Sequence, residues 1–209
     1  MQIQKLTIQG FKSFKNKTEI SLKPGINAFV GPNSSGKTNL AKAIVSGLDG
    51  KLKESIIIKL DKGKIAELSQ KTGIILQGDI KNITRNLYKD YQLEEVKKMF
   101  IKNASNLGLE NINLDALSSL SESEQALTAI SLFFAVQEYK NCQLYILDEI
   151  DCNLDKYNSE KLSLFLEKLM KEKQAIIITH NDALIKKSTS LYGVSKEEGI
   201  SKVIGLGVK

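Results

Sequence analysis

The segment Gly31–Thr38 reads GPNSSGKT and matches the phosphate-binding pattern G-x-x-x-x-G-K-[ST]. Residues 26–30 before it form an apolar run typical of a buried strand, and residues 38–48 after it carry apolar side chains on one helical face. A glycine-rich loop between a strand and a helix turns its backbone N–H groups, and the positive end of the helix dipole, toward an anion. The segment therefore predicts a site for a nucleoside triphosphate; a Gly/Ser-rich turn that matches by chance is the alternative.

A second apolar segment, residues 144–147, ends in two adjacent carboxylates. Lys37 of the loop is expected to reach the β- and γ-phosphates, and the Thr38 hydroxyl is expected to ligate Mg²⁺. Asp148 can then hold the Mg²⁺ shell while Glu149 polarises the attacking water. Two acids after a strand also fit a helix N-cap or a solvated turn. Together with the glycine-rich loop they predict a phosphate-loop ATPase.

Two further strand ends carry polar residues that suit the same site. His180 follows the buried segment 175–179, at the edge where ligands gather in open α/β sheets. It stands in the place of a switch that contacts the γ-phosphate in one class of ATPases, and a surface or core histidine is the alternative. Gln77 ends another apolar segment and could touch Mg²⁺ and the attacking water, or be an ordinary polar residue at a strand end.

The segment 120–124 reads LSESE and precedes a long apolar helix pattern. Ser121 is a plausible N-cap, and the free N–H groups of a helix N-terminus can bind an anion. Ser121 with Glu124 three residues on also fits a simple capping box. The two interpretations are compatible, because in ATP-binding-cassette proteins this helix end faces a γ-phosphate held by a second subunit.

The composition fits one globular domain. The chain has 209 residues, 42% hydrophobic and 26% charged, which allows a core without disulfides. Two cysteines and one histidine cannot complete a zinc site, and reduced thiols predict a cytoplasmic location. With no leader pattern and no apolar run of about 20 residues, neither export nor a membrane partner is expected. The net charge of +6 is compatible with nucleic acid, although a solvated lysine-rich surface is the commoner explanation.

The order of apolar segments predicts an α/β fold. Residues 3–22 alternate in polarity around a turn at 15–17, which predicts a two-stranded hairpin, and further antiparallel strands are expected at 55–60 and 73–77. Buried strands are expected at 26–30, 144–147 and 175–179, helices at 38–48, from Gln92, at 123–139 and at 156–170, and a polar loop over 103–115. This alternation predicts a mixed or antiparallel N-terminal sheet plus a parallel sheet core with flanking helices.

Together these motifs resemble the head domain of the structural maintenance of chromosomes (SMC) ATPases, within the ATP-binding-cassette class. Residues 10–14 look like the opening F-K-S-F of that family, and the phosphate loop with its flanks looks like its G-P-N-G-S-G-K-S-N. Residues 77–80 are similar to its Q-loop, and residues 148–155 to its D-E-x-D-A-A-L-D. The tail over 191–203 follows the SMC ending, which generic transporter ATPases lack. The resemblance covers the chain from Ile3 to Ile204.

The resemblance implies ATP and Mg²⁺ as cofactors and an ATP-dependent homodimer. Each ATP would lie between the phosphate loop of one copy and Ser121 of the other. Glu149 would be the catalytic base, Asp155 would couple the two sites, and His180 would contact the γ-phosphate, with Gln77 as a third catalytic residue. The implied nucleotide-binding residues are Lys12, Ser13, Gly31, Asn33, Ser34, Ser35, Gly36, Lys37, Thr38, Asn39, Ser121, Ser123 and Asp155, and the implied metal ligands are Thr38, Gln77 and Asp148. DNA and other subunits of an SMC complex are the implied partners, in chromosome organisation or repair.

The chain departs from the family pattern in two places. Glu122 and Ser123 stand where family members carry glycines, and a carboxylate about 4 Å from a phosphate costs on the order of 1 kcal/mol or more. Between Gln77 and Ser121 the family inserts hundreds of residues of coiled coil and a hinge, whereas about forty residues intervene here, without sustained heptads. The chain is therefore either a compact relative or a head joined across a deletion.

The expected organisation is a single head, residues 1–209, in three parts. Residues 1–85 hold the phosphate loop and Q-loop, residues 86–140 form a helical region with LSESE, and residues 141–209 hold Asp148, Glu149, Asp155 and His180. Two other functions stay open. A transporter ATPase subunit would need a membrane partner and an aromatic adenine platform before the loop. A nucleotide-sensing module would bind ATP and scarcely hydrolyse it, because of the altered LSESE segment.

Overall fold

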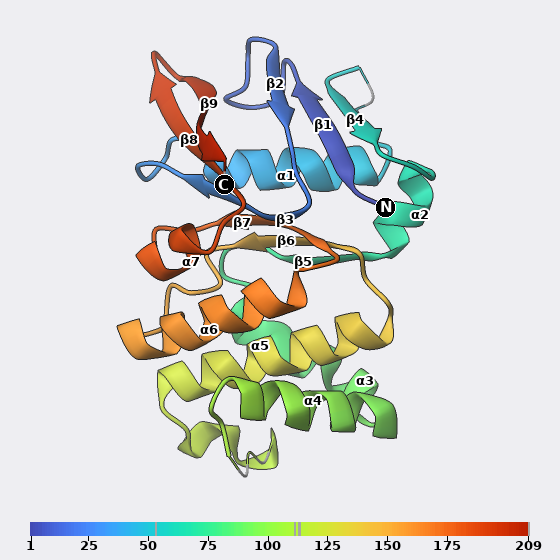
Figure 1. Ribbon diagram of the computed structural model, residues 1–209, viewed down its shortest axis with the longest axis vertical. Helices are drawn as coiled ribbons and strands as arrows, with labels where there is room; N and C mark the ends of the chain where they lie inside the picture. The colour runs from blue at the N-terminus through green and yellow to red at the C-terminus, as the bar shows by residue number, and fades with distance from the viewer. Residues whose placement is uncertain (53, 111, 113, 209) are drawn as a thin grey trace.

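Two β-sheets of the computed structural model enclose the helix that follows the phosphate loop (Figure 1). The structure describes residues 1–52, 54–110, 112 and 114–208. Within them, β1 (Ile3–Ile8), β2 (Thr18–Ser21) and β4 (Ile56–Leu60) form an antiparallel sheet in the order β2-β1-β4. A second sheet contains β3 (Gly25–Val30), β5 (Thr72–Ile75), β6 (Leu144–Asp148), β7 (Gln174–Ile178), β8 (Ser190–Glu197) and β9 (Ile200–Val208). Its order is β5-β6-β7-β3-β8-β9, parallel except for β9.

The helices cover both faces of the second sheet (Figure 1). Helix α1 (Lys37–Leu48) lies between the two sheets, and α5 (Glu122–Tyr139) and α6 (Lys156–Leu169) cover the opposite face. Helices α3 (Ile80–Tyr91) and α4 (Glu94–Asn106) form an outer layer against α5. The shorter helices are α2 (Ile65–Gln70), the 3-10 helix η1 (Leu114–Ser119) and α7 (Asp182–Lys186). None of the helices in the described part of the chain is long and apolar enough to cross a membrane.

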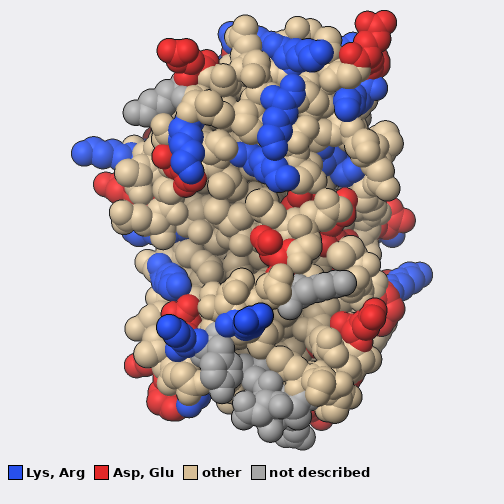
Figure 2. Space-filling view, turned by 180° about the vertical axis from the view of Figure 1, so that it is seen from behind, with Lys and Arg blue, Asp and Glu red and all other residues tan. Residues whose placement is uncertain are grey.

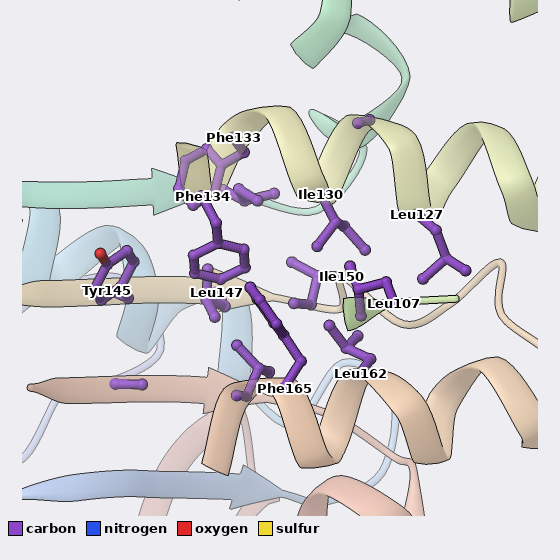
Figure 3. Packing of buried hydrophobic residues seen from close by; sticks show 14 of the residues in the cluster. Leu107, Leu127, Ile130, Phe133, Phe134, Tyr145, Leu147, Ile150, Leu162 and Phe165 are labelled. Atoms are coloured by element: carbon purple, nitrogen blue, oxygen red, sulfur yellow. The ribbon is translucent and has the colours of Figure 1, made fainter. Parts of the chain in front are cut away.

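The main core lies between the second sheet and its two covering helices (Figure 3). Phe134 of α5 packs its ring 5.3 Å from the rings of both Tyr145 on β6 and Phe165 on α6. A second core surrounds α1, whose Leu40 and Ile44 are fully buried between the sheets. Burial on both sides of β6 and β7 explains why these strands are continuous apolar runs. The two cores hold the ends of β3, β6 and β7 in fixed positions.

The predicted fold class is confirmed, and one strand direction is wrong. The N-terminal sheet is antiparallel, and the core sheet is parallel with one antiparallel edge strand. The segment expected as an antiparallel strand at 73–77 is β5, which runs parallel to β6 with Ile74 opposite Ile146. The spacing of apolar residues indicates which side chains are buried, but not whether a strand runs parallel or antiparallel to its neighbour. The direction of β5 depends on its partner β6, which lies about seventy residues further along the chain.

The sequence patterns did not predict the helices α2, α3, α7 and η1, and the helical layer is compact. Helix α2 is only six residues long, and the apolar stripe of α3, with Ile80, Ile83 and Leu87, stands in an otherwise polar segment. In the polar loop expected at 103–115, α4 extends to Asn106 and η1 begins at Leu114, while residues 111 and 113 lie outside the described residues. Helices α3 and α4 are joined by Gln92 and Leu93 alone. The residues between Gln77 and α5 therefore form a short helical layer.

Candidate nucleotide-binding site

The predicted motifs lie along one side of the molecule. Strands β3, β6 and β7 are parallel and point to the same side, where α1, α5 and α6 begin (Figure 1). In open parallel sheets, ligands bind beyond the carboxyl ends of the strands. The topology therefore brings together the phosphate loop after β3, the carboxylates after β6 and His180 after β7.

The phosphate loop is held in a conformation that glycine favours. Gly36 has φ 111° and is the N-cap of α1, so the helix N-terminus opens directly onto the loop. A Cβ on Gly31 would lie 2.1 Å from the carbonyl oxygen of Val194, which leaves no room for a side chain. Ser34 adopts φ 64° where the family pattern has glycine, a left-handed conformation that strains a residue with a Cβ.

The loop lysine is folded onto its own loop. Lys37 is 5% exposed, and its Nζ donates to the carbonyl oxygens of Gly31 at 2.8 Å and Pro32 at 3.0 Å. Burial lowers the pKa of Lys37, and the carboxylates of Glu149 and Asp148 oppose that shift. The ammonium group thus stays next to the cavity in which phosphates would lie.

A cavity of about 530 Å³ opens beside the loop, a size that suits a nucleotide. It is lined by Asn33, Ser34, Gly36, Lys37, Thr38, Asn39, Gln77, Glu149 and Lys196. Eight of these nine residues were predicted from the sequence, and Lys196 was not. The lining is strongly polar, as recognition of a phosphorylated ligand requires.

Asp148 at the end of β6 is buried with little compensation. Its side chain is 1% exposed, and neither carboxylate oxygen has a hydrogen-bond partner of good geometry. Burial raises the pKa of Asp148, although the nearby Thr38 hydroxyl acts in the opposite direction. An unpaired buried carboxylate beside a threonine hydroxyl fits a hard cation such as Mg²⁺, which prefers oxygen ligands. These residues therefore fit the predicted metal position.

Glu149 lies between Gln77 and His180. Its oxygen Oε2 accepts from Gln77 Nε2 at 2.6 Å, and its Oε1 lies 3.7 Å from His180 Nε2. Glu149 adopts φ 54°, a conformation uncommon for a residue with a side chain and typical of strained functional positions. Its backbone N–H donates to Ile178 on β7 at 2.9 Å, which fixes the turn. Gln77 and Glu149 line the cavity, whereas His180 is not among its lining residues and is placed next to it only through Glu149.

Asp151 is a further buried acid. It lies within the segment 148–155, and the sequence motifs assign it no role. It is 7% exposed and accepts from the Thr179 hydroxyl at 2.6 Å, and that hydroxyl accepts from the backbone N–H of Asn181 at 2.9 Å. Burial raises the pKa of Asp151, and the hydrogen bond from Thr179 opposes the shift. The chain of contacts joins the segment after β6 to the residues on both sides of His180.

The LSESE segment and Asp155 lie outside the lining of this cavity. Ser121 caps α5 in a capping box, with its N–H 2.9 Å and its hydroxyl 2.6 Å from Glu124 Oε2. The Ser123 hydroxyl donates to the carbonyl of Asn153 at 3.1 Å. Asp155 caps α6 by accepting from the Asn158 backbone at 2.9 Å. These motifs form a second polar cluster, separate from the phosphate loop.

The FKSF segment contributes one buried serine. The Ser13 hydroxyl accepts from Asn39 Nδ2 at 2.9 Å, which joins this segment to the start of α1. Lys12 is exposed, with φ 51° and its Nζ 5.6 Å from the Phe11 ring centroid. Neither Lys12 nor Ser13 lines the cavity described above. Gly31, Ser35 and Asp148 lie behind the lining residues rather than among them.

The fold and these motifs define a phosphate-loop nucleotide-binding head of the ATP-binding-cassette type. The family model described as "RecF/RecN/SMC N terminal domain" matches residues 2–202, and the chain belongs to this family.

Relatives and solved structures agree with this assignment. The chain is 32% identical to the chromosome partition protein Smc of Halothermothrix orenii over 165 residues, which covers 75% of this chain and 14% of that protein. It is similar to the SMC head domain of Thermotoga maritima, with a TM-score of 0.76, 25% identity and full coverage of both chains. The fold is also similar to that of an Smc head bound to the C-winged helix domain of ScpA, with a TM-score of 0.80 and 22% sequence identity. The alignment covers 100% of this chain and 98% of that chain. The chain spans 8–14% of the length of the Smc relatives it matches. The comparisons confirm the resemblance to SMC heads.

Proposed function

We propose that this chain is an SMC-type ATPase head that binds and hydrolyses ATP with Mg²⁺ in a homodimer. The observation that carries the proposal is that the phosphate loop and Glu149 line one cavity, while Asp148 is buried next to the lining residue Thr38. A nucleoside triphosphate would take the N–H groups of the loop and the start of α1, with Lys37 beside its terminal phosphates.

The residues at the strand ends support hydrolysis. Thr38 and Asp148 would hold Mg²⁺, which when bound would neutralise charge on the phosphates. Glu149 would accept a proton from the attacking water, and Gln77, at hydrogen-bond distance from Glu149, would orient that water. His180 lies 3.7 Å from Glu149 and would contact the γ-phosphate.

The position of the second polar cluster supports a dimer. Ser121, Ser123 and Asp155 do not line the cavity that holds the phosphate loop, among the residues described. Ser121 and Asp155 are the N-caps of α5 and α6, and these helices begin on the same side of the molecule as α1 (Figure 1), so a second copy facing this side could present them to the nucleotide. The unit of hydrolysis is then a pair of chains.

The test is the mass in solution of the Glu149→Gln variant with ATP and Mg²⁺. Glutamine keeps the shape of the side chain and removes the base, so ATP should accumulate and hold the dimer together. The matched control is Lys37→Ala, which should bind ATP poorly and stay monomeric. A Glu149→Gln protein that binds ATP and is monomeric at high protein concentration would contradict the dimer model.

A nucleotide-sensing module with little hydrolysis is the second candidate function. One observation favours it: Ser121 is engaged by Glu124, and the exposed Glu122 adds a further carboxylate to the first turn of α5. Both carboxylates disfavour a phosphate at that helix end. Steady-state turnover of the purified protein separates the two functions, because a sensor would bind ATP and release almost no phosphate.

DNA and SMC-complex subunits are the proposed partners, in chromosome organisation or repair. Lysine side chains gather on the upper part of one face, over the region of the three-stranded sheet (Figure 2). Such a surface supports DNA binding through phosphate contacts, with a steep decrease of affinity as salt rises. A subunit with a winged-helix domain is proposed because a similar Smc head binds that domain of ScpA. We further propose a cytoplasmic location and a single functional head over residues 1–209.

A further inference from the structure

The hairpin of β8 and β9 runs directly beside the phosphate loop. Strand β8 is parallel to β3, and their pairing ends at Val30 opposite Gly193. Beyond this point β8 continues along the loop, and the Val194 carbonyl lies where a Cβ on Gly31 would clash. Lys196 is three residues after Gly193, just as Asn33 is three residues after Val30. Both Lys196 and Asn33 line the nucleotide cavity.

Hydrogen bonds hold this hairpin against the loop. Lys196 lies opposite Ser201 on β9. The Ser201 hydroxyl donates to the Ser35 carbonyl of the loop at 2.6 Å, and the Ser201 N–H donates to the Ser13 carbonyl at 2.8 Å. A Cβ on Gly36 would lie 2.2 Å from the Ser201 hydroxyl oxygen, so the contact is close. The backbone of Lys196 is therefore fixed relative to the loop.

Lys196 is the second cation of the cavity. Among the described lining residues, only Lys37 and Lys196 carry a positive charge. The Lys37 ammonium is engaged by two loop carbonyls, and the neighbouring Glu197 pairs with Lys202. No ion pair of the described residues includes Lys196, which is exposed to solvent. Its ammonium can reach an anion in the cavity without breaking an existing ion pair.

We propose that Lys196 contacts the phosphates of the bound nucleotide as a second cation beside the loop lysine. The hairpin would thus be a wall of the nucleotide site that supplies one charge-assisted hydrogen bond. A lysine ammonium is a compact cation with three donors, which suits phosphate oxygens at an open rim. The inference rests on the proposed binding of a triphosphate and adds a contact from a part of the chain outside the phosphate-loop motif.

The experiment measures the affinity of the full chain for Mg·ATP and for inorganic tripolyphosphate by titration calorimetry. Lys196→Ala should weaken binding of both ligands about tenfold, the loss expected for one charge-assisted hydrogen bond. Lys196→Arg should restore most of the affinity. The matched control is Lys202→Ala on the same hairpin, which removes a lysine that pairs with Glu197 outside the cavity and should change affinity less than about twofold.

The outcomes separate this inference from the proposed function. If wild type binds ATP and Lys37→Ala does not, but Lys196→Ala binds as wild type does, the contact from Lys196 is refuted while nucleotide binding stands. If Lys196→Ala weakens ATP binding but not tripolyphosphate binding, the contact is to the nucleoside and the phosphate assignment is refuted. If wild type binds neither ligand, the proposed function itself fails. Equal melting temperatures of wild type and Lys196→Ala without ligand show that the variant is folded.

Discussion

Asp148→Asn should make the ligand-free protein more stable while it removes the response to Mg·ATP. Asparagine has nearly the same shape and no charge, and Asp148 is 1% exposed with no hydrogen-bond partner of good geometry for either oxygen. An unsatisfied buried polar group costs about 1–3 kcal/mol, and more when it is charged. Thr38 and Lys37 offset part of this cost in the wild type, and the asparagine amide still lacks partners. The expected gain is therefore about 1–2 kcal/mol at neutral pH, which corresponds to roughly 2–8 °C in Tm for a domain of this size.

The gain should depend on pH in a defined direction. The pKa of Asp148 is raised above its ordinary value of 3.8 by burial. Below the unfolded-state pKa the carboxyl is protonated in both states, and Asp148 then resembles asparagine. As the pH rises through the raised folded-state pKa, the native protein must keep a charge that burial disfavours, and stability is lost. The difference between Asp148→Asn and wild type should be smallest below the ordinary pKa of 3.8 and largest above the raised folded-state pKa.

Differential scanning calorimetry at several pH values, with and without Mg·ATP, tests this reasoning. Mg·ATP should raise the Tm of the wild type. At a ligand concentration of one hundred times Kd, the free energy of unfolding should rise by about 2.7 kcal/mol, and that of Asp148→Asn should rise much less. Asp151→Asn is the matched control, since Asp151 is also buried but already accepts from Thr179, so its neutralisation should stabilise less. An Asp148→Asn protein no more stable than wild type at neutral pH, or one that keeps the full Mg·ATP response, would refute the argument.

Three other substitutions probe the loop and the LSESE segment. Ser34→Gly should raise the free energy of unfolding by up to about 1 kcal/mol, because a φ of 64° strains serine. A lower free energy of unfolding in urea denaturation would contradict this strain. Glu122→Gly should tighten ATP-dependent dimerisation several-fold by removing a carboxylate near the phosphate, worth on the order of 1 kcal/mol. Equal dimer affinity by analytical ultracentrifugation would count against it, and Glu122→Gln separates charge from backbone effects. Ser123→Ala should speed hydrogen exchange of amides 152–155 by releasing the Asn153 carbonyl, and Ser123→Thr, which keeps the hydroxyl, should not.

Most of the cavity lining belongs to motifs that are local in the chain, so the sequence alone could point to its residues. Asn33, Ser34, Gly36 and Lys37 belong to one eight-residue motif whose strand and helix flanks fix its shape. Gln77 and Glu149 follow the ends of β5 and β6, and the carboxyl ends of parallel strands meet at one sheet edge. A residue at such a position can be assigned without knowledge of distant contacts.

Residues that reach the site through tertiary pairing could not be found in this way. Lys196 and Ser201 enter the site because β8 pairs with β3 across more than 160 residues of chain. In the sequence they are two polar residues in a hairpin, and their alternation says nothing of which strand they will join. The direction of β5 was missed for the same reason. The one available signal was the tail resemblance over 191–203, which marked the hairpin without assigning its residues.

Three unfavourable local features of this fold lie at or next to the cavity. Asp148 keeps two unpaired buried oxygens, and Glu149 and Ser34 keep positive φ angles, within a molecule whose cores are otherwise well packed. Each of these features lowers the stability of the ligand-free chain, and each lies where a triphosphate and a divalent cation would supply partners. Stabilisation by Mg·ATP should therefore arise from changes at these three residues. When Mg·ATP binds, amide hydrogen exchange should slow most at the start of α1 and at the turn after β6. Uniform slowing across the whole chain would instead mean that the ligand acts only by shifting global unfolding.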